Sequence, residues 1–198
     1  MLSAGLYNFR NMLYNSLSEK ILLFKFLLFG TDIGLSVGSI FFVETKRKMR
    51  NLYDQAEMLL ILNRLEKLNP KAQKQWGKMN VAQMLAHCSA SLETAMGHNT
   101  PQKLPFFIRM IGRMLKSSFL SAKPMPKNSG TDKSYIITDD RNFETEKMKV
   151  MQLIKTFSED GPAKCTTAPQ VFFGTMTPNE WAIMQWKHFD HHLRQFGA

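Results

Sequence analysis

The sequence predicts an all-α protein, an up-and-down four-helix bundle with an extra linker helix. Three observations support this fold class. Apolar residues recur at spacings of three or four over most of the chain after residue 50. Residues that cap helices stand before several of these segments. No segment has a convincing strand pattern, since YIIT at 135–138 is too short and isolated to form a sheet.

Two helices are predicted in the first part of the bundle. The first starts near residue 51 and ends before Pro70, because proline disfavours helical backbone in the residue that precedes it. The second begins near Asn80, where Gln83 completes a capping box, and it ends at Gly97. The apolar positions of the first helix are Leu52, Ala56, Leu59, Leu60, Leu62, Leu65 and Leu68.

A linker helix and a third long helix follow. Residues 104–120 mix apolar and basic side chains and predict the shorter linker helix, while 121–134 is a loop rich in proline, glycine and serine. The third long helix extends from Asn142 to about residue 159, and Gly161-Pro162 ends it.

The first 48 residues differ from the rest, so we divide the chain into an N-terminal extension (1–48) and a helical domain (49–198). The extension holds two apolar stretches, 21–29 and 34–43, which Lys25 and Asp32 interrupt. A membrane span requires about 20 predominantly apolar residues with few charges, and these interrupted stretches do not meet that requirement. A non-domain extension is therefore the preferred interpretation. The alternative is a membrane anchor, with the basic stretch 46–50 keeping the domain in the cytoplasm.

The composition argues against a disordered chain and against a nucleic-acid-binding protein. Hydrophobic residues make up 44% of the chain and charged residues 21%, which are values of a globular protein rather than a disordered one. The formal charge of +10 is spread along the sequence, and no zinc finger or RNA-binding motif accompanies it, so nucleic-acid binding is not expected. Two cysteines without a CxxC pair indicate a reducing, cytoplasmic location.

The last predicted helix carries three of the five histidines. It begins with the strongest signal in the chain, Thr177 as cap and Pro178 in the first turn, and it extends to about residue 196. On a helical wheel, His192 lies about 70° from the centre of the apolar stripe, His188 about 110° and His191 about 170°. His188 and His192 therefore share one face at i and i+4, whereas His191 is expected in solvent.

A histidine pair at this spacing is half of a divalent-metal site, or else two partly exposed imidazoles at the edge of a bundle. A third ligand has to come from another helix. His87 is the candidate, because it lies beside the apolar stripe of the second helix, about 120° from its centre. The remaining histidine, His98, follows Gly97 and is expected in a loop.

Three sequence blocks resemble the DinB-like family, and more narrowly a bacterial subgroup known as a domain of unknown function. They are WGKMNVAQMLAHC (76–88), FFGTMTPNEW (172–181) and KHFDHHLRQFG (187–197), and the resemblance covers about 49–198. It implies an up-and-down four-helix bundle, often a homodimer, with a divalent metal held by His87, His188 and His192. Relatives often carry His-Pro before the Phe-Phe-Gly block, where this chain has Gln170-Val171.

The function that follows is metal-dependent chemistry on a small-molecule substrate. Zinc and nickel suit imidazole ligands, and the resemblance implies a hydrolase or a transferase that uses a low-molecular-weight thiol. No catalytic residue is assigned: Asp190 is expected to pair with Arg194, Glu93 to face outward and Cys88 to be a small buried side chain.

The alternative is a non-catalytic, dimeric binding or scaffold module, tethered to a membrane through residues 1–48. The basic side chains that would then contact lipid headgroups or an acidic partner are Lys103, Arg109, Arg113 and Lys116.

Overall fold

The computed structural model describes residues 49–198, and this part of the chain is all-helical, as predicted. It holds five α-helices and two short 3₁₀ turns, Lys133–Tyr135 and Pro162–Lys164, and no strand. The α-helices are α2 (Gln55–Glu66), α3 (Val81–Ala95), α4 (Phe106–Phe119), α5 (Phe143–Asp160) and α6 (Pro178–Gln195). The predicted linker helix corresponds to α4.

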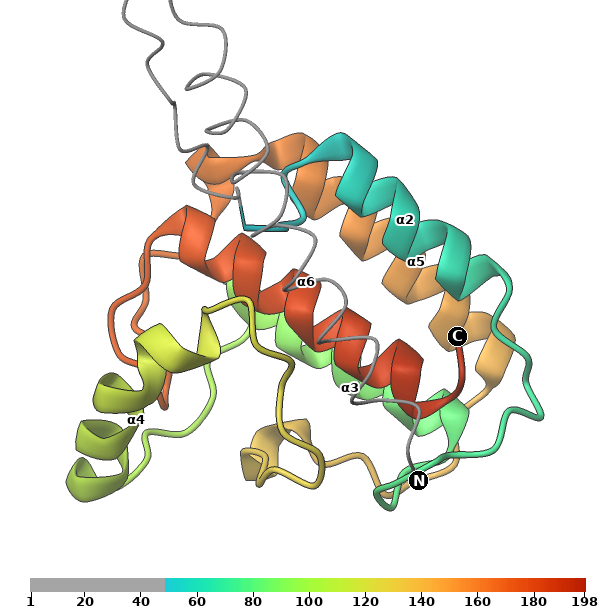
Figure 1. The fold of residues 1–198 in the computed structure, drawn as a ribbon, viewed down its shortest axis with the longest axis horizontal. Helices are drawn as coiled ribbons and strands as arrows, with labels where there is room; N and C mark the ends of the chain where they lie inside the picture. Colours follow the sequence, from blue (N-terminus) through green and yellow to red (C-terminus); the bar gives the residue numbers. More distant parts are fainter. Residues whose placement is uncertain (1–48) are drawn as a thin grey trace, which may run out of the picture. The chain divides into compact units, whose positions relative to one another are not determined.

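Four of these helices pack side by side, and α4 projects away from them (Figure 1). Helix α3 contacts α5 and α6, and α2 contacts the same two helices from the other side. The contacts also give the directions. Leu52 donates its N–H to the carbonyl of Ala182, and Arg64 pairs with Asp190, so α2 and α6 are parallel.

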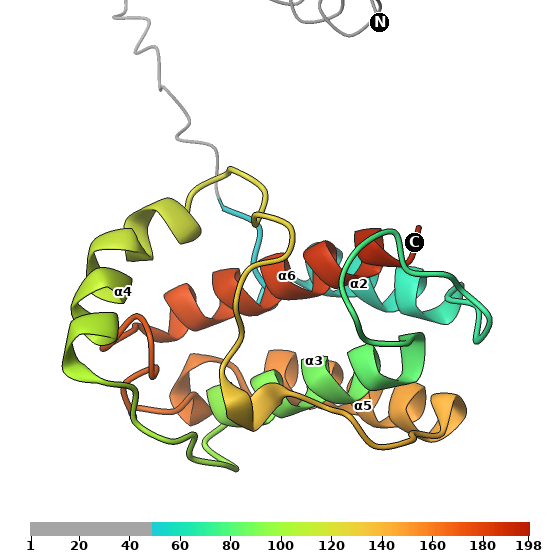
Figure 2. The same cartoon turned by 90° about the horizontal axis from the view of Figure 1, so that it is seen from below.

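Helices α3 and α5 are parallel as well, which differs from the simple alternation expected from the sequence. The amide of Gln83, at the start of α3, donates to the carbonyl of Asp139, just before α5. At the other end, the N–H of Thr166 donates to the carbonyl of Ala95. The physical reason is the long connection that contains α4, which returns the chain to the end of the molecule where α3 began (Figure 2).

Side chains cap the helix N-termini at residues that the sequence predicted. Asn80 and Gln83 form a reciprocal capping box on α3, and Thr177 and Glu180 form another on α6. The first helix begins later than expected, at Gln55, because the side chain of Asn51 accepts the N–H groups of the next residues and closes a turn instead.

A single apolar core fills the space between α2, α3, α5 and α6. Its fully buried side chains come from every one of these helices and include Ile61, Leu65, Met84, Leu85, Leu92, Ile154, Phe157, Trp181, Phe189 and Leu193. Leu59 and Leu60, which the sequence pattern assigned to the apolar face of the first helix, are exposed instead. The core fixes α3 against α6, and this contact positions the histidines.

One of the contacts between helix α4 and the rest of the domain is made at a small residue, Gly112. A Cβ added to Gly112 would lie 1.9 Å from the carbonyl oxygen of Phe172, so only glycine allows this approach. The opposite face of α4 is apolar and exposed; Phe106, Phe107 and Met114 are each at least 66% accessible. The helix therefore presents a large apolar surface that the rest of 49–198 does not cover.

The expectation of an anchor concerns residues 1–48, which lie outside the described residues. Within 49–198, no helix has both the length and the apolar character that a membrane crossing requires.

Replacing Gly112 with alanine is expected to destabilise the domain by about 1–3 kcal/mol, because the methyl group collides with the backbone of Phe172. Helix propensity alone predicts the opposite sign, since alanine is favoured over glycine by roughly 1 kcal/mol. Gly130 is the control, because an added Cβ there meets nothing within 4 Å. Urea unfolding of both variants gives the measurement, and a Gly112→Ala protein as stable as the parent would contradict this contact.

Candidate metal centre

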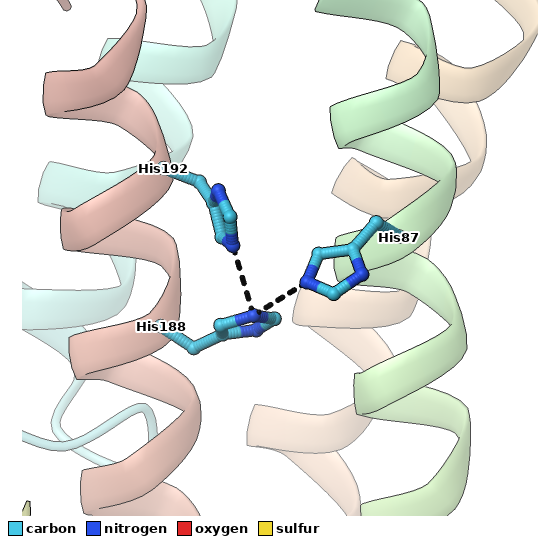
Figure 3. Close-up of side chains that lie close together, drawn as sticks. All are labelled: His87, His188 and His192. Atoms are coloured by element: carbon cyan, nitrogen blue, oxygen red, sulfur yellow. Dashed lines mark hydrogen bonds between the residues drawn. The ribbon is translucent and has the colours of Figure 1, made fainter. Parts of the chain in front are cut away.

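The three histidines singled out in the sequence meet between α3 and α6 (Figure 3). The Nε2 atom of His188 lies 2.9 Å from Nε2 of His87 and 3.1 Å from Nε2 of His192. His87 and His192 are buried, and His188 is partly exposed. Helices α3 and α6 are antiparallel, because Gln195 at the end of α6 donates to the carbonyl of Trp76, just before α3. The ring of His87 on α3 faces His188 and His192, which lie on successive turns of α6.

The tautomer of His87 is set by the backbone carbonyl of Tyr135. The Nδ1 atom of His87 lies 2.8 Å from this oxygen, which can only accept, so Nδ1 carries the proton. Tyr135 is itself held on α3 by its hydroxyl, which donates to Thr94. The Nε2 atom of His87 is therefore an unprotonated lone-pair donor that points at His188.

Gln195 sets the tautomer of His192 in the same way. The Nδ1 atom of His192 lies 2.8 Å from Oε1 of Gln195. The amide nitrogen of Gln195 donates to the carbonyl of Trp76, which fixes the orientation of the amide and leaves Oε1 as the acceptor for His192. The Nε2 atom of His192 therefore also presents a lone pair to His188.

The surroundings keep all three imidazoles neutral. Burial, together with the neighbouring His87, lowers the pKa of His192 to about 3. Burial also lowers the pKa of His87, and it lowers the pKa of His188 strongly, with His192 and His87 as the next causes. At neutral pH the cluster offers three neutral rings, the form in which imidazole binds metals.

A metal cation can bind the ring nitrogens of all three histidines at once, whereas a single proton cannot bond to both neighbours of His188. His188 can donate one N–H to one of its two neighbours, which leaves the lone pair of the other ring facing it without a partner. A tetrahedral zinc ion with bonds of about 2.0–2.1 Å separates its ligand nitrogens by roughly 3.3 Å, close to the distances found here. The three ligand atoms lie within 4.8 Å of one another, so the cluster could hold a metal ion.

Two cavities open onto the cluster. The first, which we call the apolar cleft, has a volume of about 620 Å³ and is lined by His87, His188, residues of α4 and the turn 170–173. The second, the Trp76 cavity, has a volume of about 460 Å³ and is lined by all three clustered histidines, Trp76 and His191. Residues of the segment 125–131 line both cavities.

Lys187 holds the chain just before the segment 125–131, which lines both cavities beside the cluster. Its buried ammonium group donates to the carbonyl oxygens of Phe119, Ser121 and Lys123, at the end of α4 and just beyond it. A cation in this position stabilises the carboxyl end of a helix and satisfies its free carbonyl groups. Because Lys187 precedes His188, the same turn of α6 carries both the cluster and the attachment of the segment.

The cluster contains no candidate general base. Asp190 pairs with Arg194, as predicted, and also with Arg64 at 2.8 Å. Glu93 pairs with Lys149 on α5, and Cys88 is fully buried with its pKa raised by burial. These groups are structural rather than poised for proton transfer.

The other histidines lie outside the cluster. His98 is exposed, as expected for a loop residue. His191 is half-buried rather than solvated, and its ring lies edge-on to Trp76 with 5.4 Å between centroids. The sequence interpretation also missed Tyr135, Gln195 and Lys187. Only Gln195 had a local signal, because it follows His192 by one helical turn.

Gln170, which stands where relatives often carry histidine, has a structural role. Its side-chain oxygen accepts the N–H groups of Phe172 and Phe173, and its backbone pairs with Gly174 in an isolated antiparallel bridge. The turn that results lines the apolar cleft. The residue thus shapes the cavity beside the cluster and supplies no imidazole to it.

The fold and the site define an all-helical protein with a three-histidine cluster that could hold a metal ion. The family described as "protein of unknown function (DUF1569)" matches residues 46–198, and the chain belongs to this family. Neither a curated protein nor a solved structure matches the chain.

Replacing Gln195 with methionine is expected to lower metal affinity about 10- to 100-fold, because His192 loses the acceptor that holds its Nδ1 proton. Competition with a chromogenic chelator measures this affinity in the purified protein. A His191→Ala variant is the matched control on the same helix and is expected to bind metal like the parent. Equal losses in the two variants would show that the orienting bond plays no part.

Proposed function

We propose that this protein is a metal-dependent enzyme on a DinB-like four-helix bundle, a hydrolase or a low-molecular-weight-thiol transferase. The observation that carries the proposal is the convergence of the Nε2 atoms of His87, His188 and His192 beside two cavities. His87, His188 and His192 would hold a divalent ion, zinc or nickel by their ligand type. The crossover that makes α3 and α5 parallel is compatible with a four-helix bundle, since bundles with one long connection are known.

The arrangement suits catalysis better than a purely structural metal. Structural zinc sites are closed by four protein ligands, whereas three protein ligands leave one position for a substrate. Here the open side of the cluster faces both cavities. A bound divalent ion would supply Lewis acidity toward a substrate thiol or carbonyl. The protein's own groups hold the rings in place: Tyr135 orients His87, and Gln195 orients His192.

The proposal includes a cytoplasmic location and a homodimer. Both cysteines are free and buried, which suits a reducing compartment. The exposed apolar face of α4 is a surface of the kind that a second copy of the chain covers in dimers.

The full-length protein is expected to bind about one divalent ion per chain with high affinity. His188→Ala removes the central ligand, so this variant is expected to lose the ion, while His98→Ala retains it because His98 lies outside the cluster. Elemental analysis after gel filtration gives the stoichiometry. A parent protein that carries no ion after incubation with zinc or nickel would rule out the metal centre.

A screen of the loaded protein then tests the chemistry. Low-molecular-weight thiols paired with electrophilic acceptors, and ester and amide substrates, are assayed beside the His188→Ala variant. Turnover in the parent and its loss in the variant support the proposed enzyme. Turnover of equal size in both proteins would place the activity elsewhere.

The non-catalytic alternative, a dimeric binding module, is supported by the exposed face of α4. If this face forms the dimer contact, Met114→Glu is expected to give a monomer, because an ionised side chain is costly to bury in an apolar interface. Met148→Glu is the control, since Met148 is similarly exposed but lies on α5. Light scattering coupled to gel filtration measures the mass. A Met114→Glu protein with the mass of the parent would exclude this surface as the dimer contact.

A second measurement tests the tether. Liposome binding that requires residues 1–48 would favour a membrane-tethered scaffold.

A further inference from the structure

The apolar cleft is bounded by hydrocarbon on both sides. Ile108, Leu115 and Phe119 of α4 line it together with Phe172, Phe173 and Met184. Among the described residues, no lysine, arginine or glutamate lines this cleft, and the carboxylate that does, Asp132, accepts the backbone N–H and the hydroxyl of Ser134. A volume of about 620 Å³ lies within the range of small-molecule sites.

The cleft continues to the histidine cluster without a break. His87 and His188 line its inner end, while α4 forms its outer wall. A ligand that fills it therefore has one end among apolar side chains and the other end beside two lone-pair nitrogens. An apolar cavity with a few polar groups at one end orients an amphiphilic ligand.

The charge at the inner end favours an anionic or strongly electron-donating group. Imidazole binds a metal as a neutral ligand, so three histidines would leave the two positive charges of a bound divalent ion uncompensated. The Trp76 cavity adds Lys78 to its lining, and Lys127 lies over the ring of Trp76 at 4.4 Å. An anionic head is attracted to this region, and an alkyl chain is favoured in the cleft behind it.

We propose that the substrate class of this site is an amphiphile, a small molecule with an alkyl or acyl chain in the apolar cleft and an anionic, metal-binding head at the cluster. This inference rests on the proposed metal-dependent function and specifies which substrate it serves. The Trp76 cavity then remains for a polar co-substrate, which approaches the cluster from the other side of the segment 125–131.

The experiment uses the full-length protein loaded with cobalt(II), whose visible spectrum reports ligands on the metal. Straight-chain hydroxamates, from acetohydroxamate to decanohydroxamate, bind metals through a common anionic head and differ only in tail length. The affinity is expected to rise about three- to fourfold for each methylene group until the cleft is filled. A dissociation constant that does not depend on tail length would overturn the inference.

Two variants locate the tail. Leu115→Asp places a charge in the cleft and is expected to remove the dependence on tail length while acetohydroxamate binds as before. Met148→Asp is the control, because Met148 is exposed on α5 and does not line the cleft, and it is expected to keep the full dependence. If Leu115→Asp keeps the full dependence as Met148→Asp does, the tail does not lie in the cleft and the inference is wrong.

The outcomes separate this inference from the proposed function. A protein that gives no cobalt spectrum lacks the metal centre, and both proposals fall together. A protein that binds cobalt and acetohydroxamate but shows no effect of tail length keeps the metal centre and refutes the amphiphilic substrate alone.

Discussion

The site depends on one constraint: the Nε2 lone pairs of His87 and His192 are both held facing Nε2 of His188. Tyr135 and Gln195 each hold a proton on the far side of a neighbouring ring, so both rings turn an acceptor nitrogen toward the same atom. Burial then opposes protonation of any of the three rings. One proton on His188 can satisfy one acceptor only. An arrangement of this kind is costly unless a cation lies among the rings, and the close packing of α3 on α6 prevents them from turning away.

The same packing explains why the connection between α3 and α5 lies where it does. Lys187 holds the end of α4 through three carbonyl oxygens, and Tyr135 returns the chain to α3 beside His87. The segment between these two attachments has to pass the cluster, and it separates the two cavities there. Access to the cluster is thus determined by residues adjacent to the candidate ligands, Lys187 next to His188 and Tyr135 bonded to His87.

The helix starts and the pairing of His188 with His192 could be predicted from the sequence because they depend on local interactions. The capping boxes at Asn80 and Thr177 involve residues three apart, and helix geometry alone places His188 and His192 on one face. The direction of α5 and the exposure of His191 were not predictable in this way. The burial of His191 depends on Trp76, in the connection between α2 and α3, which covers a helix face that the wheel assigned to solvent. The direction of α5 depends on the long connection between α3 and α5, which returns the chain to the start of α3. The orienting carbonyl of Tyr135 depends on the same connection, because it is far from His87 in the sequence.

Among the described residues the cluster has no general base, so either proposed reaction would depend on the metal to activate its nucleophile. Asp190 and Glu93 are held in ion pairs, and the tautomers of His87 and His192 direct their Nε2 lone pairs into the cluster. A thiol needs little help to ionise, since its pKa is about 8.5 in water, whereas water itself has a pKa of about 15.7. In hydrolysis the metal itself would have to lower the pKa of a bound water, and zinc held by three imidazoles lowers that pKa to about 7. A thiolate can bind directly to the same dipositive centre, so this donor set is compatible with both proposed reactions.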